Sequence, residues 1–565
     1  MTAPVHPGRL ARTVLATPPS QLAHRIRRHC AQAAVLRRHS PLLRQPVRAS
    51  STWPGWPAGW TPIDGRLSDL WPSGTEILDG RITLLGHTRP WGRPPDWSQH
   101  GAPLLWRFHL HYWDWAWALA RWPDTAAAQA GFGGLYRSWR SHPQAGRVAW
   151  APYVASLRAW TLCALEPVFG RDDGLGQLIR ADLRAHQRFL VRNLERDLGG
   201  NHLLKNLKAL LGLAAAAGDR AELARWSEAL AAQARAQVLQ DGGHIERSPS
   251  YHVQVLADLT DVAGLLGALA VPLPNAIGAA VDRMSDWLAT IADPDGYLPA
   301  LNDGFPVSPS LVRHLVRERT RDESVLLADS GFAVLRTDRL ALVADVGGPG
   351  PGPLGGHSHA GTLGFELRLD GRRFVMDPGT STYEASPRRA FERSTRAHPT
   401  VCVDGLDSSE VWGAFRTGRR SRVREATLRP RADGGAVLSA WHDGYRYLRD
   451  PVVHQRRWDV GPELVTVSDR LTGRGRHQIE AVFPLDPAVR VTGTDDGVLV
   501  RHRCGGQLVI CTDDSARRGG WQVERALAAS GWNRTVVHDV AVYRLVTRLP
   551  VTLVTRLRPI PAASA

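Results

Sequence analysis

The sequence predicts an α+β multidomain protein in which a helical N-terminal half is followed by a half built of antiparallel strands. Its 565 residues exceed what a single hydrophobic core usually holds, so we expect two or three domains. Between about Leu104 and Thr320, apolar residues recur at helical spacing. From about Asp329 onward they alternate with polar residues, as strands do. This change of period predicts a domain boundary around residues 321–330.

The helical half is expected to consist of consecutive helices joined by short connections. It is preceded by residues 51–100, which are rich in Trp, Pro and Gly and predict an irregular ordered segment. Helices with short connections form antiparallel hairpins, which either stack as a bundle or close as an α/α toroid. The predicted helical segments are 104–122, 153–169, 178–195, 201–218, 222–239, 251–270 and 276–292.

The C-terminal half is expected to be a large antiparallel β domain. Its alternating segments are separated by DG or GG turns, which are typical of hairpins. So many strands would not remain one open sheet, so we expect stacked sheets. The alternating segments are 331–347, 362–379, 425–441, 452–471, 477–485, 497–512 and 540–557.

The charge of the chain is strongly positive and uneven. The net charge is +16, and residues 1–50 carry nine arginines and no acidic residue. Such a segment could bind an anionic polymer or a membrane surface, although a solvated arginine-rich helical arm is the interpretation we favour. No nucleic-acid-binding motif accompanies the charge, so we expect no nucleic-acid partner.

Neither a membrane span nor a secretory signal is predicted. No apolar run approaches 18 residues, and the N-terminus lacks a continuous apolar segment of the kind that signal peptides contain. The location of the protein in the cell is therefore left open, and so is its oligomeric state. The five cysteines are few and scattered, which argues against a disulfide framework.

A run of histidines and aspartate stands out at the start of the β half. His357 and His359 lie two apart in GGHSHAGTLGFEL, Asp377 follows the next apolar segment, and His398 precedes a third. Histidine and aspartate are ligands that a zinc ion takes, and three protein ligands plus one further group complete its tetrahedron. The alternative is a metal-free cluster in which Asp377 orients a histidine by a hydrogen bond.

Two polar clusters interrupt the helical half at the beginnings of helices. GGNHLLKN contains Asn201 and His202, and DGGHIERSPSYH contains Tyr251 just after a Pro249 that predicts a helix start. Asn201 could simply cap its helix, and Tyr251 could be a half-buried aromatic residue. Because both clusters enter helices, an α/α toroid would gather them at one mouth, which favours a site.

Four segments in this order resemble the signature segments of the heparinase II/III-like polysaccharide lyases: GNHLLKN, GGHIERSPSYH, GHSHAGTLGFEL with VMDPGTSTY, and STRAHPTVCVDG. The resemblance implies an N-terminal α/α toroid, an incomplete helical barrel, followed by a C-terminal antiparallel β-sandwich domain. With it we divide the chain into a basic arm at 1–50, the toroid at 51–325 and the sandwich at 326–565. It also implies a lyase that cleaves an anionic, uronate-containing polysaccharide by β-elimination.

The chemistry of elimination explains why these residue types would be needed. Removing the C5 proton of a uronate requires that its carboxylate be neutralised and the developing enolate-like charge be stabilised. A base then takes the proton and an acid protonates the departing O4. The resemblance assigns Asn201 and His357 to the carboxylate and Tyr251 to the acid. The base is left open between Tyr251 itself and His202.

The resemblance also suggests supporting groups. A tyrosine that acts as a base needs a positive neighbourhood, for which Arg247 and Arg393 are the candidates, as substrate-binding residues. His359, Asp377 and His398 match the positions that bind a structural Zn²⁺ in members of the family that have one. His357 then turns towards the residues of the helical domain, and the resemblance implies an active site between the two domains.

Two other classes of function remain open. A glycoside hydrolase would need two opposed carboxylates, and Glu246 and Asp241 are the only obvious acids in these motifs. A non-catalytic polysaccharide-binding or assembly protein of exopolysaccharide metabolism would keep the fold and use some of the 21 tryptophans for stacking. The presence of Asn201, His202, Tyr251 and His357 together favours the enzyme.

Overall fold

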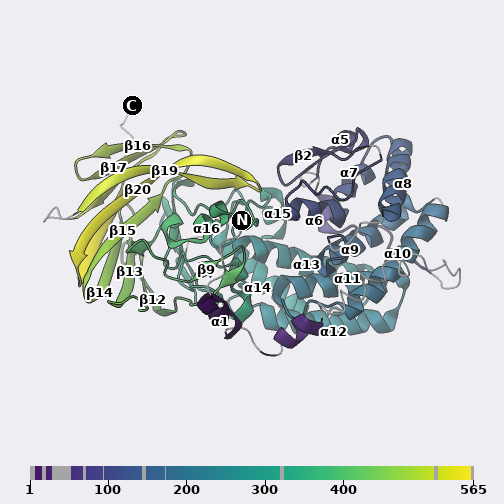
Figure 1. Cartoon of the computed structure of the whole chain (residues 1–565), viewed down its shortest axis with the longest axis horizontal. Helices are drawn as coiled ribbons and strands as arrows, with labels where there is room; N and C mark the ends of the chain where they lie inside the picture. The colour runs from purple at the N-terminus through teal and green to yellow at the C-terminus, as the bar shows by residue number, and fades with distance from the viewer. Residues whose placement is uncertain are drawn as a thin grey trace. The chain divides into compact units, whose positions relative to one another are not determined.

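The chain folds into two compact units that are interleaved in sequence (Figure 1). The strand-rich unit holds Met1–Thr17, Leu239–Val253 and Arg283–Ala565, and the helical unit holds Pro18–Val238 and Gln254–Asp282. The computed structural model describes residues 7–15, 19, 21–27, 53–67, 71–92, 94–142, 148–171, 173–317, 323–350, 352–513 and 519–560. Most of the predicted basic arm, including residues 28–50, lies outside the described residues, and so do residues 318–322 at the predicted boundary.

The predicted order of helices first and antiparallel strands second is confirmed. Helices of the helical region are α4 (Ile63–Arg66), α5 (Gly74–Leu78), α6 (Leu104–Tyr112), α7 (Trp117–Ala120), α8 (Thr125–Ser141), α9 (Pro152–Phe169), α10 (Asp173–Arg192), α11 (Gly200–Ala217), α12 (Arg220–Gln237), α13 (Pro249–Ala268), α14 (Asn275–Ile291) and α15 (Pro309–Leu315). A two-stranded sheet of β1 (Arg81–Leu84) and β2 (His87–Pro90) lies among them.

Local sequence signals explain where the helices begin and end. Asp219 caps α12 by accepting a hydrogen bond from the backbone N–H of Glu222 at 3.0 Å. Gly218 ends α11 in the left-handed conformation, with φ +70°. The segment predicted as one helix over 104–122 is instead broken, because Trp113 adopts φ +67° after the last turn of α6.

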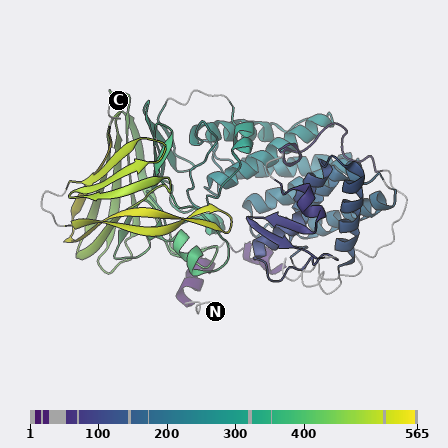
Figure 2. The same ribbon diagram turned by 90° about the horizontal axis from the view of Figure 1, so that it is seen from above.

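The strand-rich unit contains three large antiparallel sheets, whose strands appear in teal-green to yellow in Figure 2. The five-stranded sheet is ordered β3 (Val325–Leu327), β4 (Phe332–Arg336), β5 (Leu340–Asp345), β6 (Phe365–Leu369), β7 (Arg372–Val375). The eight-stranded sheet is ordered β11 (Val423–Pro430), β12 (Ala436–Tyr445), β13 (Val452–Val460), β14 (Val465–Gly473), β21 (Val551–Ile560), β18 (Gln507–Thr512), β17 (Gly497–His502), β16 (Val489–Thr494). The four-stranded sheet is ordered β19 (Gly519–Gly531), β20 (Arg534–Arg548), β15 (Arg476–Pro484), β8 (Val401–Val403).

One hydrophobic core joins these three sheets, as a stacked arrangement requires. Leu342, Trp458 and Ile479 come from the five-, eight- and four-stranded sheets respectively, and all three are fully buried in the same cluster. In β12 the inward residues alternate with outward ones, so that every second residue from Ala436 to His442 is buried. The first strand of these three sheets starts at Val325, whereas the compact units have other limits, at 17/18, 238/239, 253/254 and 282/283. The predicted domain division at 325/326 stays a prediction.

Short elements connect the sheets and carry the polar residues discussed below. They are the 3-10 turns η3 (Gly352–His357) and η4 (Thr395–Ala397), the helix α16 (Pro387–Arg393), and the short strands β9 (Val411–Trp412) and β10 (Arg416–Thr417). In the described part of the chain, every helix is too short or too polar to cross a lipid bilayer.

Candidate active site

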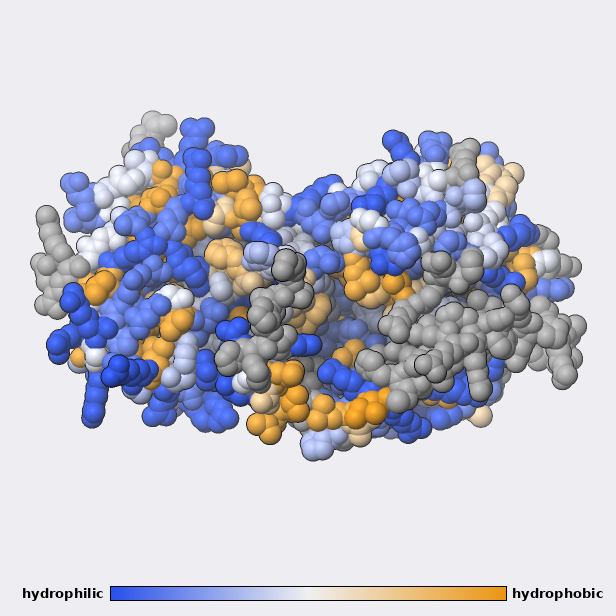
Figure 3. Space-filling view, in the orientation of Figure 1, coloured by the Kyte–Doolittle hydropathy of each residue, from blue (hydrophilic) through white to orange (hydrophobic). Residues whose placement is uncertain are grey.

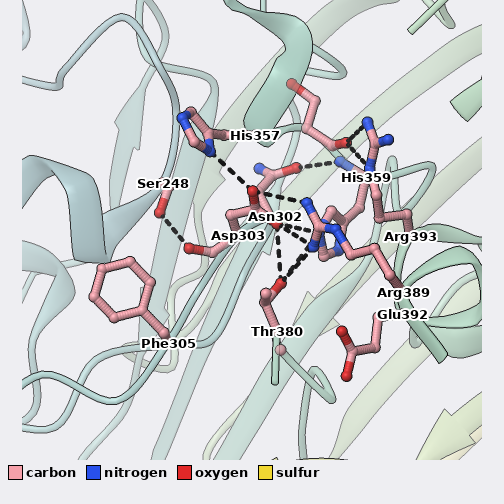
Figure 4. A network of polar contacts seen from close by, with 12 residues as sticks. Ser248, Asn302, Asp303, Phe305, His357, His359, Thr380, Arg389, Glu392 and Arg393 are labelled. Atoms are coloured by element: carbon pink, nitrogen blue, oxygen red, sulfur yellow. Dashed lines mark hydrogen bonds and ion pairs between the residues drawn. The ribbon is translucent and has the colours of Figure 1, made fainter. Parts of the chain in front are cut away.

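A buried aspartate, Asp303, organises the polar cluster of the strand-rich unit (Figure 4). Its Oδ1 accepts hydrogen bonds from His359 Nε2 at 2.8 Å, Thr380 Oγ1 at 2.9 Å and Arg389 Nη1 at 2.6 Å. Its Oδ2 accepts from His357 Nδ1 at 2.8 Å and Arg389 Nη2 at 2.9 Å. Burial would raise the pKa of Asp303, but Arg389 and the two histidines hold it well below its usual range. The carboxylate is therefore ionised and accepts every one of these hydrogen bonds.

The loop that carries Asp303 is fastened to the histidine segment on both sides. The backbone N–H of Asp303 donates to the carbonyl of His357 at 2.9 Å. The neighbouring Asn302 sits at φ +59° and its Oδ1 accepts from the backbone N–H of His359 at 3.0 Å. Asparagine tolerates this left-handed conformation better than most residues. The H-x-H segment is thus positioned by the loop between α14 and α15.

Tyr251 lies beside His357, as the family resemblance implied. The two rings are 4.0 Å apart between centroids, and the Tyr251 hydroxyl is 2.9 Å from the hydroxyl of Tyr383. Pro249 starts α13, as predicted, and places Tyr251 in its first turn. Burial and the charge of Asp303 raise the pKa of Tyr251 well above its usual value. The phenol therefore holds its proton at neutral pH.

Asn201 and His202 lie in the helical unit, in the first turn of α11. The helix is preceded by Gly199 at φ +66°, which occupies the cap position, so Asn201 is not the N-cap. His202 Nδ1 is 3.3 Å from Glu195 Oε1, and Tyr153 packs on its ring at 4.5 Å. About a third of the His202 side chain is exposed, at 34%, whereas Asn201 is buried. The predicted convergence of these two residues with Tyr251 and His357 stays a prediction.

Glu195 is itself held in place by a hydrogen-bond network. Its backbone N–H donates to Asn206 Oδ1 at 2.8 Å, and its Oε2 accepts from Asn206 Nδ2 at 3.2 Å. The same amide nitrogen donates to Ser156 Oγ at 3.0 Å. The carboxylate behind His202 is therefore buried and fixed, which orients the imidazole through Nδ1.

The two arginines predicted to bind substrate both donate hydrogen bonds to backbone carbonyls. Arg393 is buried and donates to the carbonyl of Ser358 at 3.0 and 3.3 Å, and also to carbonyls of residues 412, 413 and 416. Arg247 donates to the carbonyls of Gly347 and Gly348. The substrate-binding roles predicted for the two arginines stay predictions. The guanidinium that lies over an aromatic ring of the site is that of Arg389, 5.0 Å from the centre of Tyr383.

The three predicted zinc ligands, His359, Asp377 and His398, do not converge on one point. His359 and His398 lie with ring centroids 5.2 Å apart, and Asp377 Oδ2 accepts from His398 Nδ1 at 2.7 Å. Among the described residues, no three His, Cys, Asp or Glu side chains converge as a metal site would require. His359 Nδ1 and His398 Nε2 are nevertheless both buried without a hydrogen-bond partner. Each histidine thus has a carboxylate behind it and one imidazole nitrogen available to a metal ion.

Comparison with known proteins identifies the family. Residues 109–321 match the model described as heparinase II/III N-terminus, and residues 319–545 match the model described as heparinase II/III-like, C-terminal. The chain belongs to the heparinase II/III-like family. This agrees with the resemblance of its four motifs and with the observed order of helices and sheets.

Relatives of this heparinase II/III-like protein differ in their names. FtsZ-localized protein C of Caulobacter vibrioides is 30% identical over 253 residues, which cover 44% of this chain and 43% of the relative. A heparin-sulfate lyase of Pedobacter heparinus is 25% identical over 240 residues, 36% of each chain. The chain thus matches less than half the length of these curated relatives. A solved structure of heparinase III superposes with a TM-score of 0.72 at 16% identity, over 94% of this chain and 90% of that one, which shows the shared fold.

Sequence reasoning missed four residues of these clusters in the heparinase II/III-like chain: Asp303, Arg389, Glu195 and Tyr383. Asp303 lies in a short polar loop, and Arg389 is one of many arginines, so no local pattern distinguishes them. Glu195 precedes His202 by seven residues, across a turn containing two glycines, and contact between them could not be inferred from helical spacing. Of the four residues, Tyr383 alone could have been predicted, because it lies within VMDPGTSTY, one of the motifs that resemble the family.

Proposed function

We propose that this heparinase II/III-like protein is a polysaccharide lyase that cleaves a uronate-containing polysaccharide by β-elimination. The observation that carries this proposal is a phenol that keeps its proton beside an oriented imidazole. Tyr251 is hydrogen-bonded to Tyr383 and packs against His357, whose Nδ1 is bound to Asp303. Such an arrangement can deliver a proton to a departing sugar oxygen.

Tyr251 acts in this proposal as the general acid that protonates O4. A raised pKa favours the protonated phenol, which suits an acid and opposes a role as base. His357 is oriented through Nδ1, so its Nε2 is the nitrogen that would contact the substrate. We therefore favour His202 over Tyr251 as the base.

His202 acts as the base in this proposal. Glu195 at Nδ1 fixes the ring and makes Nε2 the nitrogen that takes the C5 proton. Asn201 and His357 bind the uronate carboxylate and withdraw its charge. The participation of Asn201 and His202 in the same reaction rests on the resemblance of their motif to that of the family.

We further propose that His359 and His398 supply two of the ligands of a structural Zn²⁺ through the two buried nitrogens that lack hydrogen-bond partners. Asp303 and Asp377 would then support the two rings, in the way that carboxylates commonly support metal-bound histidines. The ion would supply folding stability by joining the H-x-H segment to the segment before β8.

A glycoside hydrolase is less well supported, because its two acids are engaged or buried. Asp241 accepts hydrogen bonds from the backbone N–H groups of Gly243 and Ser330, and from the Ser330 hydroxyl, at 2.7 to 2.9 Å. Glu246 is 2% exposed. Neither acid has the open setting that protonation of a glycosidic oxygen requires.

A non-catalytic function is the second candidate, and one comparison favours it. The relative that is 30% identical is named for its localisation with FtsZ, not for a reaction. A protein of this kind would keep the heparinase-like fold and bind a polymer or a protein filament without cleaving sugar. The alternative therefore predicts co-sedimentation with FtsZ filaments and no unsaturated product.

The deciding experiment follows ultraviolet absorbance of the 4,5-unsaturated uronate on heparan sulfate, chondroitin sulfate, alginate and polygalacturonate. Elimination gives that absorbance, whereas hydrolysis gives new reducing ends without it. Tyr251→Phe removes only the hydroxyl and is expected to lower kcat by about 100-fold or more. Tyr447→Phe is the matched control, because its exposed hydroxyl binds the carbonyl of Asp407, and it is expected to keep full activity. Full activity of Tyr251→Phe would reject the proposed acid.

A further inference from the structure

The hairpin of β19 and β20, the longest among the described residues, carries a tryptophan at its tip. β19 and β20 pair from Gly519↔Leu545 to Gly531↔Arg534, leaving Trp532 and Asn533 as the turn (Figure 1, yellow). Asn533 has φ +57°, a conformation for which asparagine suits a tight turn. The turn conformation does not explain Trp532, because turn positions favour small or polar residues.

The tip of this hairpin is fastened to the loop that carries Tyr383. The backbone N–H of Asn533 donates to the carbonyl of Ser381 at 2.7 Å, and that of Ala529 donates to the carbonyl of Pro378 at 2.9 Å. These two hydrogen bonds join strands of the four-stranded sheet to the segment after β7. Trp532 is therefore held in a fixed place next to Tyr383.

A row of aromatic rings leads from Tyr251 to the surface. Trp532 packs against Tyr383 with centroids 4.8 Å apart and against Phe305 at 5.1 Å. Phe305 in turn contacts Tyr251 at 5.6 Å, and Phe415 lies 4.8 Å from Tyr383. Phe415 is 44% exposed and Trp532 is partly exposed. The phenol proposed as the acid is thus connected, through Phe305 and Tyr383, to two aromatic residues that are partly exposed.

Burial in the sandwich core does not explain Trp532. Trp521, near the start of the same strand β19, packs on that core through Phe483 at 5.8 Å and Tyr543 at 5.6 Å. The contacts of Trp532 are instead with residues around Tyr251. Trp532 is only half-buried, and aromatic side chains with a few polar groups are typical of ligand sites.

We propose that Trp532 and Phe415 form a stacking platform for a pyranose ring of the polysaccharide, next to the sugar whose O4 receives the proton of Tyr251. This inference rests on the proposed lyase function and adds to it a subsite that selects a sugar ring by its shape. The C–H-bearing face of a pyranose is apolar and flat enough to lie on an aromatic ring, whereas its charged substituents point outward. Both platform residues are uncharged, so this subsite contacts the pyranose ring itself. Other residues would bind the charged substituents of the sugar.

The test measures binding separately from cleavage. In the Tyr251→Phe background, dissociation constants are measured by calorimetry for oligosaccharides of heparan sulfate, chondroitin sulfate, alginate and polygalacturonate. Adding Trp532→Ala is expected to weaken binding about 10-fold, while Trp532→Phe restores most of it. Val537→Ala is the control, because Val537 is 56% exposed on β20 of the same hairpin. Hydrophobic residues lie over β19 and β20 in Figure 3.

The binding measurements can reject the stacking platform independently of the lyase function. Unchanged affinity of the Trp532→Ala protein overturns the platform, and so does the absence of binding to all four oligosaccharides by the parent protein. If the parent binds without ever eliminating and Trp532→Ala weakens that binding, the platform stands and the lyase function fails. In a protein that does cleave, Trp532→Ala is expected to raise KM about 10-fold and leave kcat nearly unchanged, a split that general unfolding would not produce.

Discussion

Arg389 donates to both carboxylate oxygens of Asp303, at 2.6 and 2.9 Å, and neither side chain is exposed to solvent. The pair also touches both histidines of the H-x-H motif, because Asp303 accepts from His357 and His359. One buried ion pair therefore supports the residue proposed to bind substrate and a residue proposed to bind zinc. We therefore expect a substitution at the zinc site to alter the position of His357, and a substitution at His357 to alter the zinc site.

Asp303→Asn is expected to destabilise the protein by about 3–5 kcal/mol, because Arg389 would remain buried without its counter-charge. The free energy of unfolding in denaturant measures this. Asp370→Asn is the control: Arg339 also donates to both oxygens of Asp370, at 2.9 and 2.8 Å, but that pair is largely exposed. Its loss is expected to cost about 1 kcal/mol or less. Equal effects of the two substitutions would contradict the structural role of Asp303.

Glu195→Gln is expected to lower kcat by about 10- to 100-fold with a small change in KM, because His202 would lose the carboxylate that orients it. His202→Ala should abolish most of the activity, and adding Glu195→Gln to it should cost little more. Glu222→Gln removes a more exposed partner of Arg225 on α12 and should have no effect. Additive losses in the double variant would show that Glu195 does not act through His202.

Zinc content is expected to fall in His359→Ala and in His398→Ala, as measured by inductively coupled plasma mass spectrometry on the purified protein. Each substitution removes one of the two buried nitrogens that lack hydrogen-bond partners. His502→Ala is the control, because that histidine packs on Phe374, at 5.7 Å, away from the cluster. An unchanged zinc content in both variants, or none in the parent protein, would reject the metal site.

The stability of the helical unit is expected to fall in acid through His186. This buried imidazole accepts from Arg158 Nε at 2.9 Å, and burial and Arg158 lower its pKa to about 3. Because the unfolded chain binds a proton near the ordinary pKa of 6.5, the contribution of the neutral ring is present above that pH and is lost as pH falls from 6.5 towards 3. The destabilisation caused by His186→Gln should therefore shrink by about 2 kcal/mol between pH 8 and pH 5. A difference that does not change with pH would contradict the neutral buried state.

Features that depend on neighbouring residues could be predicted from the sequence. The change from helical to strand periodicity and the start of α13 at Pro249 followed from local patterns, whereas the proximity of Tyr251 to His357 was implied by the family resemblance. Local conformation and the direction of each side chain are set by a few residues on either side, so such patterns are visible along the chain.

Pairings between distant residues were decided only by the tertiary structure. Asp303 and Arg389 are 86 positions apart, and nothing along the chain marks this arginine rather than Arg393 as the one that meets the carboxylate. Similarly, Asp377 binds His398 instead of converging with both histidines. The sequence determined which elements form and which residue types reach the cluster. The packing of loops from α14–α15, α16 and the sheets determined which partner each buried charge takes, because a buried charge must be matched by whichever group the fold brings to it.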